Sequence, residues 1–330
     1  MAIYNINKLR EKDIPSIIDF VSSNSFSQYD DYKPNKKEFY ENMLNRFVKD
    51  KAKFAYCSKS KEGRFTGALL FEELSFDTKL FGVKTVQLKD IIISQSQDRN
   101  KVFDKTRLLM AFFMKEMNKQ KVKFIQCKLD SRNRYIAQVL EKLGFMLASV
   151  DVNFIKDLVS INNNKNKNKG HSYSISSCND KDVDYLYEMS KKAYSTTRFH
   201  NDPKITKEQA DEMQALWAKN CYHQKLADKI IIVRKSKKIL GYVAIEILKG
   251  ISFPNNMKIA NIVLIAVDKK FKGRGIGKVL IQESSDWAKS NGCSFLAAGT
   301  QIINNTSVKF YQKNGFKLQS SVLSFHKWMQ

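Results

Sequence analysis

The sequence predicts an α/β protein of two tandem, similar units, each a twisted mixed sheet flanked by helices. The chain has 330 residues, a length typical of two domains. A polar, low-complexity stretch at 161–171 (INNNKNKNKGH) is typical of a linker, because it cannot pack into a core. The order of strand and helix patterns before this stretch recurs after it. We therefore expect domains at 1–157 and 173–330, joined by a linker at 158–172.

Each half alternates runs typical of strands with stretches that carry apolar residues at helical spacing. In the first half, strands are predicted at 53–58, 66–73, 83–93, 123–129 and 146–155, and helices at 102–119 and 133–142. In the second half, strands are predicted at 172–177, 229–234, 240–248, 258–267, 294–299 and 316–327, and helices at 180–192, 206–220, 275–289 and 305–313. Both halves therefore consist of strands with helices between them.

The repeat is clearest at a helix that ends in Gly-Phe. The segment NRYIAQVLEKLGF at 133–145 corresponds to NTSVKFYQKNGF at 305–316, and a glycine closes the helix in each. Aligning Gly144 with Gly315 gives an offset of 171 residues. The motif alone is common, but the shared element order favours a true duplication.

Composition excludes several classes of protein. Apolar residues make up 43% and aromatic residues 12%, which is typical of a globular chain. No apolar run approaches the roughly 18 residues of a membrane helix, and the N-terminus lacks the features of a signal peptide. The five cysteines are scattered without a CxxC pair, and there are only four histidines. We therefore expect no disulfide framework, no metal site and a cytoplasmic, reducing location.

The formal net charge is +24. Such an excess can indicate nucleic acid, an anionic membrane surface or phosphorylated ligands. Lysine is spread along the whole chain, and no block of five like charges stands out, so compositional drift is the first explanation. Anionic small molecules come second, and nucleic-acid binding is the weaker reading because the cations do not form a stripe with aromatics.

The most informative segment is VDKKFKGRGIGKVLI at 267–281, where a predicted strand leads through three glycines into a predicted helix. Gly273, Gly275 and Gly277 allow a tight turn with N–H groups pointing outward. A helix N-terminus favours a pyrophosphate because its N–H groups are unpaired and its dipole is positive. The spacing differs from the GxGxxG of a dinucleotide site, and no Ser or Thr follows the Gly-Lys pair as in a P-loop.

Two motifs here resemble those of the GCN5-related N-acetyltransferase (GNAT) family. Lys272-x-x-Gly275-x-Gly277 resembles the acyl-CoA signature Arg/Gln-x-x-Gly-x-Gly/Ala after a long strand, with Lys as a departure. Asn304, seven residues before Tyr311 in a helix that ends in Gly-Phe, resembles the second signature. The resemblance covers 173–330 well and 1–157 as a degenerate copy.

The resemblance implies a GNAT fold for both units and acetyl-CoA as the acyl donor of the second. The residues that it places at acetyl-CoA are Ile265, Ala266, Val267, Lys272, Gly273, Arg274, Gly275, Ile276, Gly277, Lys278 and Asn304. The 171-residue offset puts Asp104 and Thr106 where the second half has Gly275 and Gly277, and Leu140 where it has Tyr311. We therefore expect the first unit to bind no acetyl-CoA.

A narrower resemblance, to bacterial dTDP-fucosamine N-acetyltransferases, rests on three segments. They are STTRFHNDP at 195–203 before a helix with Ala210-Asp211 and Trp217, Gly299-Thr300-Gln301, and Phe76-Asp77-x-x-Leu80-Phe81-Gly82. This group acetylates the amine of a nucleotide-linked 4-amino-4,6-dideoxy sugar, so the resemblance implies an acceptor of that class.

The substrate-binding residues implied by that resemblance are Arg198, His200, Asp202, Asp77 and Phe81. Each has a structural alternative. Arg198 could bind a diphosphate or pair with Asp202, and His200 could contact the sugar or cap the next helix. Asp77 and Phe81 could simply belong to a tight turn with a glycine.

The chemistry of direct transfer suggests the catalytic residues. An amine attacks the thioester itself in a ternary complex, so no Ser or Cys nucleophile is needed. Tyr311 is the candidate general acid for the leaving thiolate, and a packed core tyrosine is its alternative. A backbone N–H of strand 264–267 would meet the oxyanion. Glu246 and His200 are the candidate bases, although Glu246 could be solvated surface.

Asn304 would bind the pantetheine or a nearby water, and a plain helix N-cap is its alternative. Other functions remain open from the sequence: acetylation of a protein, peptide or other small amine, or a non-catalytic module that binds acyl-CoA or nucleic acid. The sequence names neither the sugar nor the acyl group, and it leaves the oligomeric state open, a homodimer included.

Overall fold

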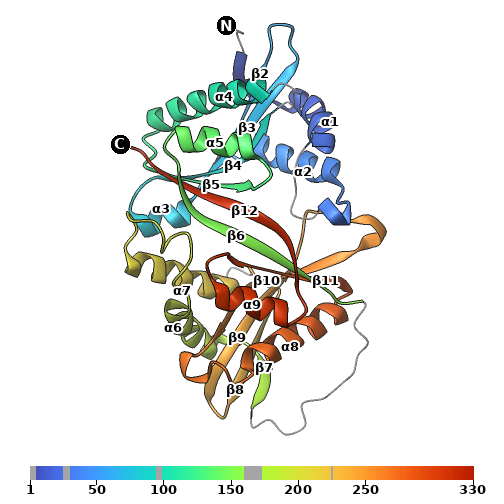
Figure 1. Ribbon diagram of the computed structural model, residues 1–330, viewed down its shortest axis with the longest axis vertical. Helices are drawn as coiled ribbons and strands as arrows, with labels where there is room; N and C mark the ends of the chain where they lie inside the picture. The colour runs from blue at the N-terminus through green and yellow to red at the C-terminus, as the bar shows by residue number, and fades with distance from the viewer. Residues whose placement is uncertain (1–4, 25–29, 94–98, 160–172, 224–225) are drawn as a thin grey trace. The chain divides into compact units, whose positions relative to one another are not determined.

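The computed structural model of the chain describes residues 5–24, 30–93, 99–159, 173–223 and 226–330. They form two compact units, each with segments from both halves of the chain (Figure 1). The first unit comprises Met1–Val150, Gly250–Pro254 and Ser321–Gln330, and the second comprises Asp151–Lys249 and Asn255–Ser320.

The first unit has a mixed sheet with the strand order β1-β2-β3-β4-β5-β12. Its strands are β1 (Asn5–Lys8), β2 (Lys53–Lys59), β3 (Phe65–Glu73), β4 (Thr85–Ile93), β5 (Phe124–Asp130) and β12 (Lys317–Trp328). Neighbouring strands are antiparallel except β4 and β5. A parallel pair requires a crossover connection, and α4 (Arg99–Lys119) provides it.

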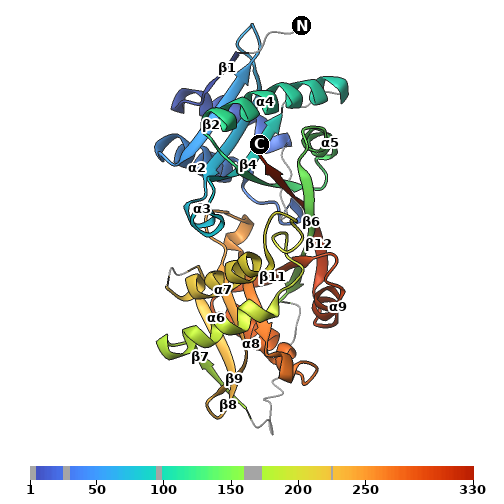
Figure 2. The same cartoon turned by 90° about the vertical axis from the view of Figure 1, so that its left-hand side faces the viewer.

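Helices cover both faces of this sheet (Figures 1 and 2). On one face, α4 and α5 (Arg134–Lys142) bury Phe113 and Leu140. On the other, α1 (Ile14–Asn24) and α2 (Lys36–Lys49) bury Ile17 and Leu44. The short helix α3 (Ser75–Phe81) ends at Gly82, whose positive φ of 69° closes it. The sequence offered a tight turn as the structural explanation of Asp77 and Phe81. The structure has a short helix there, closed by a glycine cap.

The second unit repeats this plan with the strand order β6-β11-β10-β9-β8-β7. Its strands are β6 (Met146–Asp157), β7 (Ser174–Ser177), β8 (Lys229–Lys235), β9 (Lys238–Ile247), β10 (Lys258–Val267) and β11 (Cys293–Gln301). Here β10 and β11 are the parallel pair, connected by α8 (Ile276–Ser290). The predicted mixed sheets flanked by helices are thus confirmed in both units.

Two pairs of helices sandwich the second sheet as well (Figure 2). On one face, α8 and α9 (Asn305–Lys313) bury Leu280 and Tyr311. On the other face, α6 (Val183–Ala193) and α7 (Lys207–His223) bury Leu186 and Cys221. None of the helices in the described part of the chain is both long and apolar enough to cross a membrane.

The last strand of each half completes the sheet of the other unit. Residues Asp151–Asp157 of β6, which ends the first half, pair with β11 in the second unit. Residues Val322–Trp328 of β12, which ends the chain, pair with β5 in the first unit. The expected domains, 1–157 and 173–330, assigned each of these strands to its own half, so the two units divide the chain differently at these points.

The duplication reaches further than the sequence motif. The helix pair α5 and α9 and the strand pair β6 and β12 each start and end at the same 171-residue offset. β1 and α1 match β7 and α6 at an offset of 169 residues, which also aligns Lys12-Asp13 with Lys181-Asp182. In both units a buried aspartate precedes that first long helix and pairs with a strand cation: Asp13 with Lys59, and Asp182 with Arg234.

All strands and helices predicted from residue 53 onward are present, with ends shifted by a few residues. The sequence predicts no helix or strand before residue 53, whereas the structure has β1, α1 and α2 there. Most of the predicted linker, 160–172, lies outside the described residues. Leu158, at its expected start, is buried in the second unit and its N–H donates to Ser294 O at 2.9 Å.

Candidate active site

The glycine turn lies at the N-terminus of α8, in the second unit. Gly275 is the N-cap residue, with φ 82°, and Gly273 has φ 77°. Both are left-handed conformations that favour glycine. A Cβ atom added at either position would meet no atom within 4 Å, so the space beside the turn is open.

This turn can hold an anion. The N–H groups of Ile276, Gly277 and Lys278 open the helix and have no acceptor one turn earlier; Val279 is the first to donate within it, to Gly275 O at 3.2 Å. Exposed cations flank the turn, namely Lys272, Arg274 and Lys278. Because backbone donors, dipole and side-chain charges all favour negative charge, the residues present fit a pyrophosphate such as that of acetyl-CoA.

Gly277 serves a different purpose. A Cβ there would lie 3.0 Å from Cε2 and 3.1 Å from Cζ of Phe310, on α9. The missing side chain therefore lets α9 pack against the first turn of α8. This contact brings the two sequence motifs together, since Tyr311 is the neighbour of Phe310 on α9.

β10 separates from β11 partway along its length. The parallel pairing runs only from Lys258 to Ile262, whereas the pairing with β9 continues to Val267. The register with β9 shifts between Ile262 and Leu264, the mark of a β-bulge. The bulge moves alternate side chains to the other face: Ile262 packs with α8, whereas Leu264 packs with α6 and α7.

Beyond Ile262, the side of β10 that β11 leaves pairs with no strand among the described residues. Asp268 N–H donates to Leu240 O at 2.9 Å, across from β9. Because alternate residues of an antiparallel ladder face the partner strand, the backbone groups of Ile265 and Val267 face the side that β11 leaves. The hydroxyl of Tyr194 donates to Ile265 O there, at 3.1 Å.

Tyr311 is 3% exposed and is surrounded by aromatic rings. Its ring centroid lies 5.7 Å from that of Phe154, 5.5 Å from Phe310 and 5.3 Å from Phe316. Burial raises the pKa of the hydroxyl above its usual value, so it holds its proton at neutral pH. Tyr311 is therefore packed in the core, as the structural alternative states. It also keeps the proton that a general acid needs.

Asn304 caps α9. Its Oδ1 accepts a hydrogen bond from Ser307 N–H at 3.2 Å, which is the structural alternative stated from the sequence. The cap fixes the first turn of the helix that carries Tyr311.

Glu246 lies near the end of β9 and is half-buried. It accepts a hydrogen bond from Nδ2 of Asn261, its partner on β10, at 3.0 Å. It shares a face of the strand with Tyr242 and Ala244, which pack with α6 and α7. Burial, and then the charge of Glu246, raise the pKa of Cys221 on α7 to about 12, which places the carboxylate near that helix.

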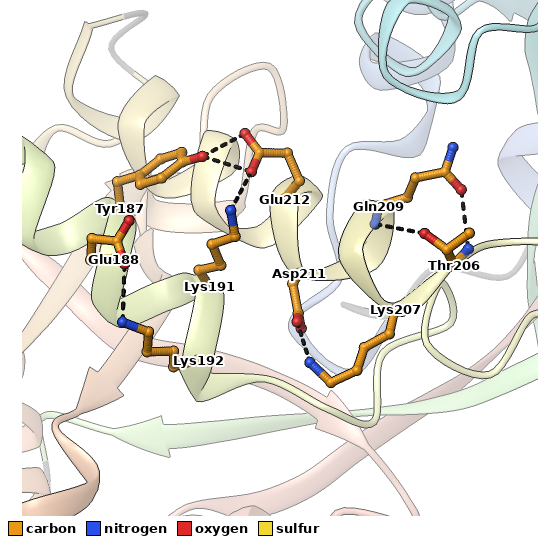
Figure 3. Close-up of polar contacts among 9 residues, drawn as sticks. All are labelled: Tyr187, Glu188, Lys191, Lys192, Thr206, Lys207, Gln209, Asp211 and Glu212. Atoms are coloured by element: carbon orange, nitrogen blue, oxygen red, sulfur yellow. Dashed lines mark hydrogen bonds and ion pairs between the residues drawn. The ribbon is translucent and has the colours of Figure 1, made fainter.

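His200 is held at both ring nitrogens. Nδ1 shares a hydrogen bond of 2.7 Å with Thr197 Oγ1, and Nε2 shares one of 3.0 Å with Asp211 Oδ1 on α7. Asp211 also forms an ion pair with Lys207 (Figure 3). The imidazole therefore ties the segment before α7 to that helix, a role close to the capping alternative rather than that of a free base.

The other residues of this segment are also ordered by their neighbours. Asp202 is 2% exposed, and its Oδ1 accepts from Lys204 N–H at 2.9 Å. The guanidinium carbon of Arg198 lies 4.3 Å from the ring centroid of Phe199. Figure 3 shows how α7 is tied to α6 in turn: Glu212 accepts from Tyr187 and pairs with Lys191.

Asp77 and Phe81 belong to the first unit, on α3. Asp77 Oδ2 accepts a hydrogen bond from Gln126 Nε2 at 2.6 Å. Phe81 is buried, with its ring edge-on to Phe124 at 5.6 Å. Both contacts anchor α3 to β5.

The second unit thus brings together the glycine turn, Tyr311 and the open side of β10. The sequence reading missed Tyr194, whose only signal is its place directly before the STTRFHNDP segment. It also missed the bulge in β10, because NIVLIAV at 261–267 is apolar almost throughout and shows no break in period. In the described ranges, no group of three His, Cys, Asp or Glu residues could hold a metal ion.

Comparison with known proteins agrees with this geometry. Residues 185–316 match the model of the acetyltransferase (GNAT) family, a span that includes the turn, β10 and Tyr311. The curated "dTDP-fucosamine acetyltransferase" of Escherichia coli is 25% identical over 198 residues, 60% of this chain and 78% of that protein. "Spore coat polysaccharide biosynthesis protein SpsD" of Bacillus subtilis is 23% identical over 147 residues, 44% of this chain. The match spans about half, 48%, of SpsD.

Among solved structures, a tandem GNAT protein from the clavulanic acid biosynthesis pathway has a TM-score of 0.64 with 10% identity. It covers 99% of this chain and 98% of its own. At this identity the likeness concerns the fold, and it confirms the expected GNAT fold with two tandem units.

Proposed function

We propose that this chain, whose residues 185–316 belong to the acetyltransferase (GNAT) family, transfers the acetyl group of acetyl-CoA to the amine of a nucleotide-linked amino sugar. The observation that carries the proposal is the open glycine turn at the N-terminus of α8, with positive φ at Gly273 and Gly275 and no atom within 4 Å of an added Cβ.

The donor would be held by backbone groups. The N–H groups of Ile276, Gly277 and Lys278 would bind its pyrophosphate, and Lys272 and Arg274 would add charge. The backbone of Ile265 and Val267, on the open side of β10, would line the pantetheine arm. The first unit would hold no donor, because Asp104 and Thr106 lie inside α4 rather than in a glycine turn.

Bound acetyl-CoA supplies an activated acetyl thioester, which an amine can attack without a covalent enzyme intermediate. An N–H of Ile265 or Val267, on the side of β10 that β11 leaves, would donate to the carbonyl oxygen as charge develops on it. Tyr311, which stays protonated because burial raises its pKa, would give its proton to the departing thiolate.

Glu246 is the better of the two candidate bases. His200 has both ring nitrogens engaged by Thr197 and Asp211, whereas Glu246 has one carboxylate oxygen bound by Asn261 and the other available for a proton or a water. Asn261 would orient the carboxylate while it accepts the proton of the sugar ammonium.

The acceptor class rests on the relatives. The similar E. coli protein is named a dTDP-fucosamine acetyltransferase, and SpsD is named for polysaccharide biosynthesis. A net charge of +24 suits an acceptor that carries a diphosphate, and Arg198, His200 and Asp202 remain the proposed contacts in the second unit. The five cysteines are free thiols, in line with a cytoplasmic enzyme.

The test is an activity panel on the purified chain. Acetyl-CoA is mixed with nucleotide-linked amino sugars, and free thiol and the mass of the product are followed. Lysine-containing peptides and simple amines form the second arm of the panel. We expect thiol release with a 42-dalton gain on a nucleotide-linked amino sugar, the mass of one acetyl group replacing hydrogen. Release with peptides alone would overturn the acceptor class, and no release with any amine would overturn the activity.

A further inference from the structure

Tyr194 follows the last residue of α6 and reaches the open side of β10. Its hydroxyl donates to Ile265 O at 3.1 Å, so the side chain is fixed to the strand at the point that β11 leaves. A phenol that donates in this way stays protonated, and burial raises the pKa of this one well above its usual value. The Tyr194 side chain is therefore held in one position beside β10.

A second tyrosine helps to fix the end of α6 that precedes Tyr194. The hydroxyl of Tyr242, on β9, lies 2.6 Å from Ser190 Oγ, which donates to Leu186 O at 2.7 Å on α6. Tyr242 is fully buried beside Tyr194, in the core that α6 and α7 form with the sheet. The helix end that carries Tyr194 is thus tied to the strand next to β10.

Tyr194 lies near Tyr311, the proposed general acid, and therefore near the proposed site of acyl transfer. Tyr311 lies close enough to add to the rise in the pKa of Tyr194, after burial and Tyr242. In the proposed function the sulfur of the donor lies at Tyr311 and the acyl carbonyl at the backbone of Ile265 or Val267. The acyl chain continues from that carbonyl, beside the backbone oxygen that Tyr194 occupies.

We propose that Tyr194 is a specificity-determining residue that limits the length of the acyl group this unit transfers. Its ring, fixed through the hydroxyl at Ile265 O, would lie beside the methyl of a bound acetyl group and would occupy the space that a longer acyl chain requires. The inference rests on the proposed function, because it needs the donor to lie along the open side of β10.

The test compares acyl donors on the full chain. Values of kcat/KM are measured with acetyl-, butyryl- and hexanoyl-CoA for the wild type, Tyr194→Ala and Tyr194→Phe. We expect the wild type to prefer acetyl-CoA strongly, and Tyr194→Ala to raise the hexanoyl-to-acetyl ratio by about tenfold or more, as expected when methylenes gain or lose a fitting pocket. Tyr194→Phe keeps the ring and should keep most of the acetyl preference.

Tyr185, an exposed tyrosine on α6 at 61% exposure, provides the matched control, and Tyr185→Ala should leave the ratio unchanged. A Tyr194→Ala ratio equal to that of the wild type would overturn the inference. So would a wild-type enzyme that uses hexanoyl-CoA as well as acetyl-CoA, a result that stands even if the alanine variant does not fold. Thiol release without chain-length discrimination would refute this inference alone, whereas no release with any donor would refute the proposed function itself.

Discussion

Tyr311 combines a packed ring with the hydroxyl that the proposed reaction uses. Replacing it with Phe keeps the three aromatic contacts and removes only the oxygen. We expect kcat to fall by roughly 10²–10⁴-fold, the usual contribution of a general acid, with little change in KM for acetyl-CoA. The measurement is steady-state kinetics together with the melting temperature of the same preparation. A folded Phe variant that turns over at nearly the wild-type rate would leave only the packing role.

Asp90, on β4 of the first unit, has a buried carboxylate whose ionised form is disfavoured by burial. Its Oδ1 accepts from Ile91 N–H at 2.8 Å, and Tyr40 donates to it, yet burial outweighs both and raises its pKa to about 6. A folded-state pKa above the unfolded value means that the folded chain binds this proton more tightly. The stability that this provides is fully present below the unfolded pKa, near 4, and is lost as the pH rises to about 6.

We therefore expect Asp90→Asn to be more stable than the wild type at neutral pH, by roughly 2–3 kcal/mol for a shift of this size. Urea unfolding from pH 4 to pH 8 measures it. The wild type should lose stability between pH 4 and 6, whereas the variant should lose less. Asp104→Asn, at a carboxylate 59% exposed on α4, is the control and should follow the wild type. Parallel curves for all three proteins would show that the Asp90 carboxylate carries no such penalty.

At the level of the elements, the contact between α8 and α9 depends on Gly277. A valine there would place side-chain atoms against the ring of Phe310, which already lies 3.0 Å from an added Cβ. We expect Gly277→Val to lower the melting temperature and, by shifting α9, to lower kcat more than it changes acetyl-CoA affinity. Calorimetry and kinetics on the variant measure both. Wild-type kcat in a destabilised variant would separate the helix contact from catalysis.

The strands and helices were largely predictable because their signals are local. Gly144 and Gly315 end helices in left-handed conformations, with φ 75° and 84°, as the sequence pattern indicates. The bulge in β10 was not predictable, because a run of apolar residues allows either face to be buried. No helix is predicted before residue 53, although α2 has a side-chain cap: Asn35 Oδ1 accepts a hydrogen bond from Glu38 N–H at 3.2 Å.

The candidate site also has features that the sequence predicts and features that it does not. The glycine turn could be predicted, because only glycine tolerates the φ of 82° at Gly275. The partners of His200 could not, because Thr197 and Asp211 are chosen by the packing of the segment against α7. The role of Tyr194 depends on Ile265, 71 residues away in the sequence, and its place before the STTRFHNDP segment does not indicate that contact.

For the whole molecule, the exchange of β6 and β12 could not be predicted from the sequence, because the residue pattern of a strand does not determine which strand it pairs with. Two equivalent phenylalanines test it. Phe325, on β12, is buried in the first unit's core, and Phe154, on β6, in that of the second. Each replacement by Ala should cost about 3–5 kcal/mol, and hydrogen exchange locates the loss.

We expect Phe325→Ala to speed exchange in β5, although it lies near the C-terminus, and Phe154→Ala to speed exchange in β11. The reverse pattern, with each variant loosening the unit of its own half, would contradict the strand exchange. Equal loosening of all strands by both variants would contradict it as well.

We expect one donor site per chain, at the glycine turn of α8. Gly275 and Gly63 form a matched pair for testing it: their φ values are 82° and 78°, and an added Cβ would meet nothing within 4 Å at either. Valine strains the backbone equally at both, but only Gly275 lies at the proposed site. The two variants therefore separate lost binding from lost stability.

Titration calorimetry with acetyl-CoA on the wild type, Gly275→Val and Gly63→Val is the most direct measurement. We expect one molecule bound per wild-type chain, the same for Gly63→Val, and no detectable binding by Gly275→Val at concentrations that saturate the wild type. Two molecules bound per chain, or a folded Gly275→Val protein that binds as tightly as Gly63→Val, would contradict the account.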